Sequence, residues 1–200
     1  MKTTMFIAFG LLIASQAAAA EKGFVPLFDG KTLDGWHALP GGNWQVKDGV
    51  IVGTSPRSER RHGILLSDKL LKDFTIRLKF KALKGNSGLY FRAEKVNHPH
   101  GVNGFQAEIA DRGSIGGLYE TGGRAWVVKP SAEQVKKCFK PGEWNQMTVS
   151  ARGRHICVEV NGQKTAELRD DPGRLEGHIG LQLHGGQDMH VEFKDIELSE

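Results

Sequence analysis

The chain has 200 residues, of which 39% are hydrophobic and 25% charged, and its formal net charge is +4 at pH 7. That length and apolar fraction suit a globular domain with a core of its own. The basic residues are scattered: Arg77, Lys79 and Lys81 alternate along one predicted strand instead of forming a continuous stripe. The charge distribution therefore argues against a nucleic-acid-binding protein.

Residues 1–20 have the pattern of a secretory signal peptide. Lys2 supplies the positive charge, Met5 to Ile13 form a short apolar run, and Ala18 to Ala20 fit a small-residue cleavage site. The apolar run is too short to span a bilayer. We therefore expect residues 1–20 to be removed, leaving residues 21–200 as a single domain in the periplasm or outside the cell, with no membrane attachment.

Almost every later segment has the features of a β-strand or a turn. Asp48-Gly49 and Asn161-Gly162 each separate two short apolar runs, and both dipeptides are typical of two-residue hairpin turns. From Phe74 to Phe80, apolar and polar residues alternate, which predicts a half-buried strand. We expect the chain to turn back on itself at Gly85 to Gly88.

The last predicted strand contains a change of register. Its apolar set runs through Phe193 and resumes at Ile196, which predicts a β-bulge near Lys194-Asp195. Only residues 132–139 have helical spacing. Many short strands, 26 glycines and regularly spaced turns predict an all-β fold, an antiparallel β-sandwich.

The two cysteines leave two alternatives open. Cys138 and Cys157 both lie in the part expected to be exported, where a disulfide is possible. The sequence alone cannot place their Cα atoms within bonding range, so one disulfide and two free thiols both stay possible. There is no Cys-x-x-Cys motif to indicate a redox site or a zinc knuckle.

Two segments far apart in the chain share a pattern that indicates a binding surface. In each, apolar residues alternate with amides and one titratable residue. The polar members are Gln106 and Glu108 in residues 104–109, and Gln182 and His184 in residues 179–184. Alternate residues of a strand point to opposite faces. A merely solvated face is usually rich in Lys, Thr, Glu and Ser, so we interpret this one as a floor that hydrogen-bonds a ligand.

Motifs along the chain resemble one known family. They are Leu27 to Trp36, Trp44 with Asp48-Gly49, Asp73-Phe74, Asn86 to Arg92, Gln106 to Asp111, Gly142 to Asn145, Val160 to Gly162 and Gly177 to His184, ending in Phe193 to Ile196. This order resembles the exported bacterial 3-keto-disaccharide hydrolases, also called 3-keto-glucoside lyases or hydratases, over residues 24–199. The resemblance implies a concanavalin A-like jelly roll, two curved antiparallel sheets with sugar bound on the concave face. It also implies chemistry on a 3-keto-glycoside.

The acidic residues decide which carbohydrate reactions are possible. An ordinary glycosidase needs two carboxyl groups across the glycosidic bond. Asp111 follows Glu108 by three positions, so it should point to the opposite face unless the strand ends or bulges. A 3-keto sugar has a different requirement. A base removes the C2 hydrogen, the C1 substituent leaves by β-elimination, and water adds to the enone.

For that route, Glu108 or His184 is the candidate base, and the other residue or Asp111 is the candidate proton donor. The residues expected to contact the sugar are Asn86, Arg92, Gln106, Gln182, Tyr119 and Trp126. Tyr119 and Trp126 lie in a glycine-rich stretch and would stack on the ring. Gly88 and Gly180 would let the substrate approach the sheet closely.

Plainer interpretations stay open. Glu108 and Arg92 would also suit a cross-strand ion pair, and Asn86 suits a turn. His98 and His100 flank Pro99 as two metal ligands would, but no third ligand is evident, so we expect neither a metal nor a cofactor. Two alternative functions remain: a noncatalytic carbohydrate-binding module, and an ordinary glycosidase that uses Glu108 and Asp111.

Overall fold

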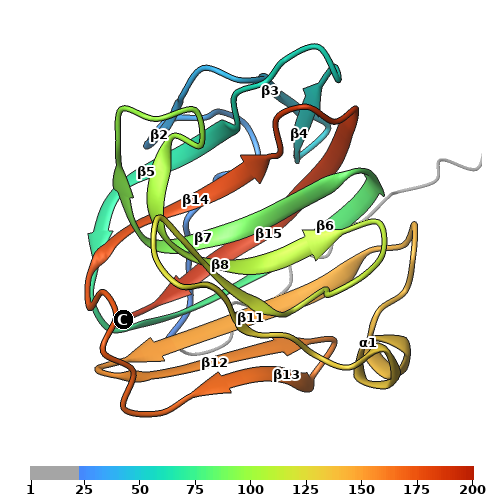
Figure 1. The fold of residues 1–200 in the computed structure, drawn as a ribbon. Helices are drawn as coiled ribbons and strands as arrows, with labels where there is room; N and C mark the ends of the chain where they lie inside the picture. Colours follow the sequence, from blue (N-terminus) through green and yellow to red (C-terminus); the bar gives the residue numbers. More distant parts are fainter. Residues whose placement is uncertain (1–22) are drawn as a thin grey trace, which may run out of the picture.

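The computed structural model describes residues 23–200, so the predicted signal peptide, residues 1–20, lies outside the described part of the chain. The described residues form two antiparallel sheets packed face to face (Figure 1). The eight-stranded sheet contains, in spatial order, β13 (Gln163–Leu168), β12 (His155–Val160), β11 (Asn145–Arg152), β6 (Phe74–Lys84), β15 (Met189–Ser199), β4 (Val50–Ser55) and β3 (Asn43–Lys47), with β1 (Val25–Pro26) paired to β15. The seven-stranded sheet contains β10 (Ala125–Val128), β9 (Leu118–Thr121), β8 (Val102–Ala110), β7 (Asn86–Lys95), β14 (Gly177–Leu183), β5 (Gly63–Leu71) and β2 (Trp36–Ala38).

The core fills the space between the two sheets. It receives the apolar sides of β6, β8, β14 and β15, the strands whose alternation is clearest in the sequence. Phe74, Phe80 and Phe105 are all completely buried there. Burying apolar side chains of this size stabilises the fold by about 1.5–3 kcal/mol each. The all-β sandwich of two antiparallel sheets, a jelly-roll fold, is confirmed.

The predicted hairpins and the predicted bulge are present. Asp48 and Gly49, between β3 and β4, both have positive φ, as do Asn161 and Gly162 between β12 and β13. Positive φ at both positions matches the twist of the flanking strands. In β15 the pairing with β6 shifts between Lys194 and Glu197, at the position where the apolar alternation changes register.

The expected turn at Gly85 to Gly88 is wrong. Strands β6 and β7 belong to different sheets, and only Gly85 separates them. Both strands bury one side in the shared core, so the chain has to cross from sheet to sheet instead of pairing with itself. Gly85 has φ +84°, and a Cβ atom there would lie 2.8 Å from the carbonyl oxygen of Asp188. Only glycine fits this crossing without strain.

The one helix of the described chain, α1 (Ala132–Cys138), matches the predicted segment. Ser131 caps it: the Gln134 N–H donates to Ser131 Oγ (3.2 Å), and the Ser131 N–H donates to Gln134 Oε1 (2.9 Å). Such a capping box satisfies two backbone donors that the first turn leaves open. Cys138 and Cys157 are both free thiols. Within residues 23–200 no helix has the length and apolar character needed to cross a bilayer.

Candidate active site

A polar cleft of about 340 Å³ opens on the outer face of the seven-stranded sheet. Its lining residues are His62, Asn86, Tyr90, His100, Gln106, Glu108, Tyr119, Thr121, Gly122, Trp126, Gln182 and His184. Strands β7, β8 and β14 supply the floor, β9 and β10 supply one wall, and three histidines from loops supply the rim. The volume lies at the lower end of the range of about 300–1,000 Å³ found for small-molecule sites.

Two larger hollows lack this combination of groups. One, of about 520 Å³, lies against the eight-stranded sheet, where Lys79 pairs with Asp195 (2.9 Å) and Arg77 with Glu197 (2.6 Å). The other, of about 590 Å³, lies beside residues 95–101 and has no carboxylate among its described lining residues. Of these three hollows in the described part of the chain, only the 340 Å³ cleft brings a buried carboxyl group together with amides, aromatic rings and histidines.

The cleft floor is a hydrogen-bonded set of amides around one carboxyl group. Gln106 Nε2 lies within hydrogen-bond distance of Glu108 Oε2 (2.9 Å), Gln182 Oε1 (3.1 Å) and the carbonyl oxygen of Ser87 (3.2 Å). Asn86 Nδ2 donates a short hydrogen bond to Glu108 Oε1. The sequence-predicted residues Asn86, Gln106, Glu108 and Gln182 are therefore brought together.

Gly88 makes room for this floor. Opposite Glu108 in the β7–β8 register, a Cβ atom at Gly88 would lie 2.5 Å from Gln106 Cγ. The side chain of Gln106 passes across the glycine to reach Gln182 on β14. The expectation that Gly88 and Gly180 leave room for substrate is corrected, because Gln106 fills the first space and Tyr90 with its apolar neighbours borders the second.

Glu108 is a buried carboxyl group, and the side chains of residues 23–200 at hydrogen-bond distance from it are the amides of Asn86 and Gln106. Burial raises its pKa to about 7, outweighing the hydrogen bond from Asn86 and the more distant charge of Lys129, which both lower it. Removing a carboxylate from water disfavours its charged form, and neutral donors compensate only in part. Glu108 can therefore both give and take a proton near neutral pH.

Tyr90 extends the floor toward β9. Its hydroxyl lies 2.8 Å from Thr121 Oγ1, and Gln182 Nε2 donates to it at 3.2 Å. Burial raises the pKa of Tyr90 well above its usual range, so the phenol stays protonated. Sequence reasoning missed Tyr90, although it occupies the same face of β7 as Gly88 and pairs with Gln106. The two-residue spacing from Gly88 to Tyr90 could have placed Tyr90 on the cleft face of the strand.

Tyr119 and Trp126 form the aromatic wall. Their rings lie edge to face with centroids 5.5 Å apart, and Lys129 Nζ lies 5.2 Å from the Trp126 ring centroid. Trp126 is among the few large apolar side chains that are exposed. An exposed aromatic pair beside a polar floor offers an apolar surface to a sugar ring, in agreement with the placement expected for both residues.

Histidines form the opposite rim. His184 follows β14, His62 precedes β5, and their ring centroids are 4.3 Å apart. The His184 N–H donates to the carbonyl of Asn86 (3.2 Å), which ties this rim to the floor. Burial lowers the pKa of His62 to about 4, with repulsion from the neighbouring histidines in the same direction. Nothing in the sequence marks His62, because loop packing alone brings it to the cleft.

Arg92 does not lie in the cleft, contrary to the sequence prediction. Its φ is +48°, and β7 has one residue more than β8 between Phe91 and Glu94. This bulge turns the side chain away from the floor. Its guanidinium donates instead to the carbonyls of Arg174 (3.0 Å), Lys72 (3.0 Å) and Gly153 (2.8 Å). Arg92 has 1% of its surface exposed, and its hydrogen bonds connect three loops. It does not lie at hydrogen-bond distance from Glu108.

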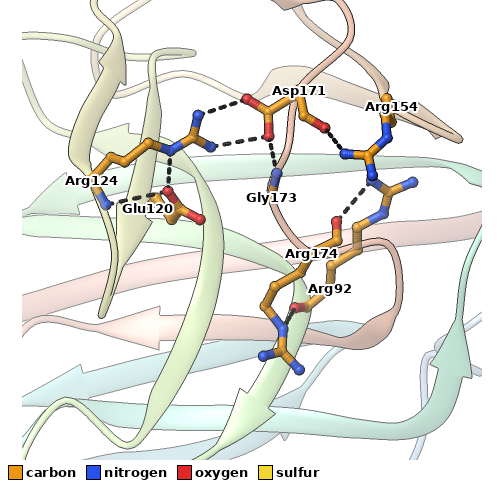
Figure 2. A network of polar contacts seen from close by, with 7 residues as sticks. All are labelled: Arg92, Glu120, Arg124, Arg154, Asp171, Gly173 and Arg174. Carbon is orange, nitrogen blue, oxygen red and sulfur yellow. Dashed lines mark hydrogen bonds and ion pairs between the residues drawn. The ribbon is translucent and has the colours of Figure 1, made fainter.

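Arg92 belongs to a second polar network, shown in Figure 2. In it, Arg124 Nη1 and Nη2 donate to the two carboxylate oxygens of Asp171 (2.8 and 3.0 Å), and Arg124 Nε donates to Glu120. Arg154 donates to the carbonyl of Asp171 (2.8 Å). Arg124 lies in the turn between β9 and β10, so this network also fixes the hairpin that carries the aromatic wall.

Asp111 also lies apart from the cleft lining. Strand β8 ends at Ala110, and Asp111 Oδ2 accepts a hydrogen bond from the Gly85 N–H (3.3 Å). The side chain thereby supports the crossing from β6 to β7. The sequence-based proposal that Asp111 is a proton donor is not supported by this position, because Asp111 is absent from the described residues that line the cleft.

The histidine pair considered as metal ligands lies at the edge of the site. The rings of His98 and His100 are 3.8 Å apart between centroids, and His100 Nε2 lies 3.1 Å from Asn103 Oδ1. His100 lines the cleft, whereas His98 lines the adjoining hollow. Over residues 23–200, no three His, Cys, Asp or Glu side chains are grouped so that they could hold a metal ion.

The sequence matches the family described as the 3-keto-alpha-glucoside-1,2-lyase-like domain over residues 23–199. The chain belongs to this family. Among curated proteins, a 3-keto-disaccharide hydrolase of Bacteroides thetaiotaomicron is 31% identical over 84 residues. That alignment covers 37% of this chain and 29% of the relative, so the chain matches less than a third of that protein.

Solved structures share the fold. A protein from Parabacteroides distasonis, described as a candidate glycosyl hydrolase, has a TM-score of 0.66 at 23% identity, covering 88% of this chain and 93% of that one. The carbohydrate-binding module CBM66 from Bacillus subtilis has a TM-score of 0.65 at 16% identity, covering 83% of this chain and 96% of that module. One fold thus hosts proteins named as hydrolases and as binding modules, and the site has to decide between these functions.

Proposed function

We propose that the protein is an exported enzyme that cleaves 3-keto-glycosides by abstraction of the C2 proton, β-elimination of the C1 substituent and hydration of the enone. Membership of the 3-keto-glucoside lyase-like family supports carbohydrate chemistry of this kind. The observation that carries the proposal is Glu108, whose pKa burial raises to about 7, in the same cleft as His184. A proton-transfer group is most effective when its pKa is near the working pH.

The number of carboxyl groups argues for elimination over ordinary glycoside hydrolysis. A retaining or inverting glycosidase places two carboxyl groups about 5–9.5 Å apart across the bond. Among the described residues that line the cleft, Glu108 is the single carboxylate. Elimination from a 3-keto sugar needs a base near C2, hydrogen-bond donors for the C3 oxygen and an acid for the leaving oxygen. A carboxyl group, histidines and amides can supply these.

The same observation argues for catalysis over simple binding. A binding surface for a neutral sugar is well served by amides and aromatic rings, which this cleft already contains. Burying Glu108 without a cation at hydrogen-bond distance opposes its ionised form and lowers the stability of the fold at neutral pH. Retaining such a group is characteristic of a site that moves protons. The elimination and hydration steps transfer protons, release the C1 substituent as an alcohol and add water, with no net oxidation or reduction, so the route consumes no redox cofactor.

The test compares a 3-keto-disaccharide with the same unoxidised disaccharide as substrates. We expect the wild type to release 3-keto-glucose from the oxidised sugar only. Glu108→Gln should reduce turnover by about 10²–10⁴-fold while sugar binding persists. Glu133→Gln, an exposed carboxyl-to-amide change on α1, is the matched control. Binding without product would identify a carbohydrate-binding module, and equal cleavage of both sugars would identify an ordinary glycosidase.

The proposal that the protein is exported is based on the sequence of residues 1–20. The charged, apolar and small-residue parts of that segment support a cleavable leader, and the proposed substrate would then be met in the periplasm or outside the cell. The intact mass of the protein recovered from periplasm or medium should correspond to a chain that starts near Glu21. Recovery of the whole chain with Met1 from the cytoplasm would contradict export.

A further inference from the structure

The backbone of one residue, Gly185, contacts two of the three histidines of the cleft rim, His62 and His184. Its N–H donates to His62 Nδ1 at 2.9 Å, and its carbonyl oxygen lies 2.7 Å from His184 Nδ1. The two imidazoles line the same cleft, with ring centroids 4.3 Å apart. In both rings Nδ1 is therefore occupied by the protein, and Nε2 is the nitrogen left for a substrate.

The two contacts have opposite hydrogen-bond polarity. A backbone N–H can only donate, so His62 Nδ1 must carry a lone pair, and the hydrogen of the neutral ring is on Nε2. A carbonyl oxygen can only accept, so His184 Nδ1 must carry a hydrogen, and in the neutral ring Nε2 has the lone pair. The environment thus assigns a donor at Nε2 to His62 and an acceptor at Nε2 to His184.

The position of Gly185 is fixed by its neighbours. A Cβ atom at this residue would lie 2.2 Å from the carbonyl oxygen of Arg60, so only glycine allows this approach. The next residue, Gly186, donates its N–H to the carbonyl of Glu59 (2.6 Å), and the His62 N–H donates to Pro99 (2.8 Å). Both histidines are therefore held by backbone contacts from several loops, which limits rotation of their rings.

We propose that Gly185 assigns opposite proton-transfer roles to the two histidines: His184 Nε2 removes the C2 proton of a 3-keto-glycoside, and His62 Nε2–H donates to its C3 oxygen. This rests on the proposed function and deepens it by assigning the base and the donor. The low pKa of His62, which burial lowers to about 4, keeps that ring neutral at neutral pH. Glu108 is then the group that protonates the leaving oxygen.

The steps balance in protons and electrons. The C2 proton passes to His184 Nε2, and the C–H electron pair forms an enolate whose oxygen accepts from His62 Nε2–H. The enolate pair then forms the C1–C2 double bond as the C1–O bond breaks, and the leaving oxygen takes the Glu108 proton. Water adds at C1 and gives a proton to Glu108, while His184 returns its proton to C2. One water is consumed and one alcohol is released.

The tautomers can be observed directly in the wild-type protein. With nitrogen-15-labelled histidine, long-range proton–nitrogen NMR correlations distinguish a ring protonated at Nδ1 from one protonated at Nε2. We expect His62 to be the Nε2–H tautomer and neutral His184 to be the Nδ1–H tautomer. The same tautomer in both rings would overturn the assignment, whatever the catalytic rates.

The roles are tested by exchange of the C2 hydrogen of a 3-keto-glycoside in D₂O, followed by NMR alongside cleavage. His184→Ala should lose exchange by about 10²-fold or more. Glu108→Gln should still exchange the C2 hydrogen but should cleave slowly. His62→Ala should reduce kcat by about 10²–10³-fold with little change in binding, and His62→Gln, which keeps a neutral donor, should recover part of that loss.

The outcomes separate the two levels of the proposal. If exchange persists in His184→Ala and stops in Glu108→Gln, then Glu108 is the base and the assignment of roles is wrong, although elimination stands. If His62→Gln is as slow as His62→Ala and both bind sugar weakly, His62 has a structural role instead. If the wild type cleaves the glycoside without any C2 exchange or isotope effect, the proposed function itself fails.

Discussion

Glu108 and Asp171 each have 6% of their surface exposed, yet the pKa values of their carboxyl groups move in opposite directions. Burial raises the pKa of Glu108 to about 7. Burial also acts to raise the pKa of Asp171, but the hydrogen bonds from Arg124 and from the Gly173 N–H outweigh it, and the pKa is lowered. Burial alone therefore does not determine what a carboxyl group does.

Different hydrogen-bond partners contribute to this difference, and the carboxyl group of Glu108 is also the more deeply enclosed of the two. Glu108 accepts from two side-chain amides, Asn86 and Gln106, which are neutral. Asp171 accepts hydrogen bonds from the two terminal nitrogens of the Arg124 guanidinium and also from the Gly173 N–H (2.8 Å), as Figure 2 shows. A guanidinium stabilises the ionised carboxylate through charge as well as through two parallel hydrogen bonds, whereas amides supply hydrogen bonds alone. One environment favours a carboxyl group that can exchange its proton near pH 7, and the other holds an ionised carboxylate in an ion pair.

The largest expected effect concerns how stability changes with pH at Glu108. In the folded protein the carboxyl keeps its proton up to about pH 7, whereas the unfolded chain releases it near pH 4.5. Between these values the folded state binds more protons, so wild-type stability falls as pH rises through this window. Glu108→Gln has no such proton. The free energy of unfolding of the variant, relative to wild type, should therefore increase by about 3 kcal/mol from pH 4.5 to pH 7.5.

Denaturant unfolding of both proteins at several pH values measures this difference. The new amide can also change the free energy of unfolding by an amount that does not depend on pH. That amount cancels, because only the change of the stability difference with pH is compared. Glu133→Gln, at an exposed position, should give a flat difference over the same range. If the difference in free energy of unfolding between Glu108→Gln and wild type also stays constant with pH, this carboxyl group has an ordinary pKa. The contrast drawn with Asp171 would then be wrong.

A smaller effect of opposite sign is expected at Asp171. Asp171→Asn removes the charge that holds Arg124 and should lower the free energy of unfolding by about 2 kcal/mol at pH 7. Because the pKa of Asp171 is lowered, the carboxylate stays ionised from pH 5 to 8, and the loss should be constant there. Its contribution disappears only in acid, as the pH falls below the usual Asp range and through the lowered pKa.

The neighbouring residue provides the control for this change. Asp170 is exposed and has φ +52°, a conformation that asparagine tolerates, so Asp170→Asn should change stability by less than about 0.5 kcal/mol. Thermal or denaturant unfolding of the two variants side by side decides the point. Equal losses at Asp170 and Asp171 would mean that the ion pair with Arg124 adds no stability.

The smallest expected effect tests the distant charge that acts on Glu108. Lys129 lowers the pKa of Glu108 slightly through space. Lys129→Gln should therefore move the Glu108-dependent limb of the pH–rate profile upward by a few tenths of a pH unit in low salt. In about 1 M salt, where the Debye length is about 3 Å, the shift should vanish. Lys136→Gln, the same change on the exposed side of α1, should leave the profile in place at both salt concentrations.

The sequence determined the features that depend on neighbouring residues along one strand. Alternation with period two placed Gln106 and Glu108 on one face of β8, and Gln182 on the matching face of β14. The hairpin dipeptides and the bulge in β15 were likewise predicted, because turn chemistry and register are local properties. The resemblance of ordered motifs added the family, which is confirmed.

Only the tertiary structure decided the rest. A one-residue bulge in β7 turns the side chain of Arg92 to the other side of the sheet from the cleft floor. The residues Leu89 to Phe91 that precede it give no sign of a bulge. His62 reaches the rim through packing of its loop against Pro99 and Gly185, contacts between segments far apart in the chain. The pKa of Glu108 depends on how much water its surroundings exclude and on which donors face it, and both are set by side chains from other strands and loops.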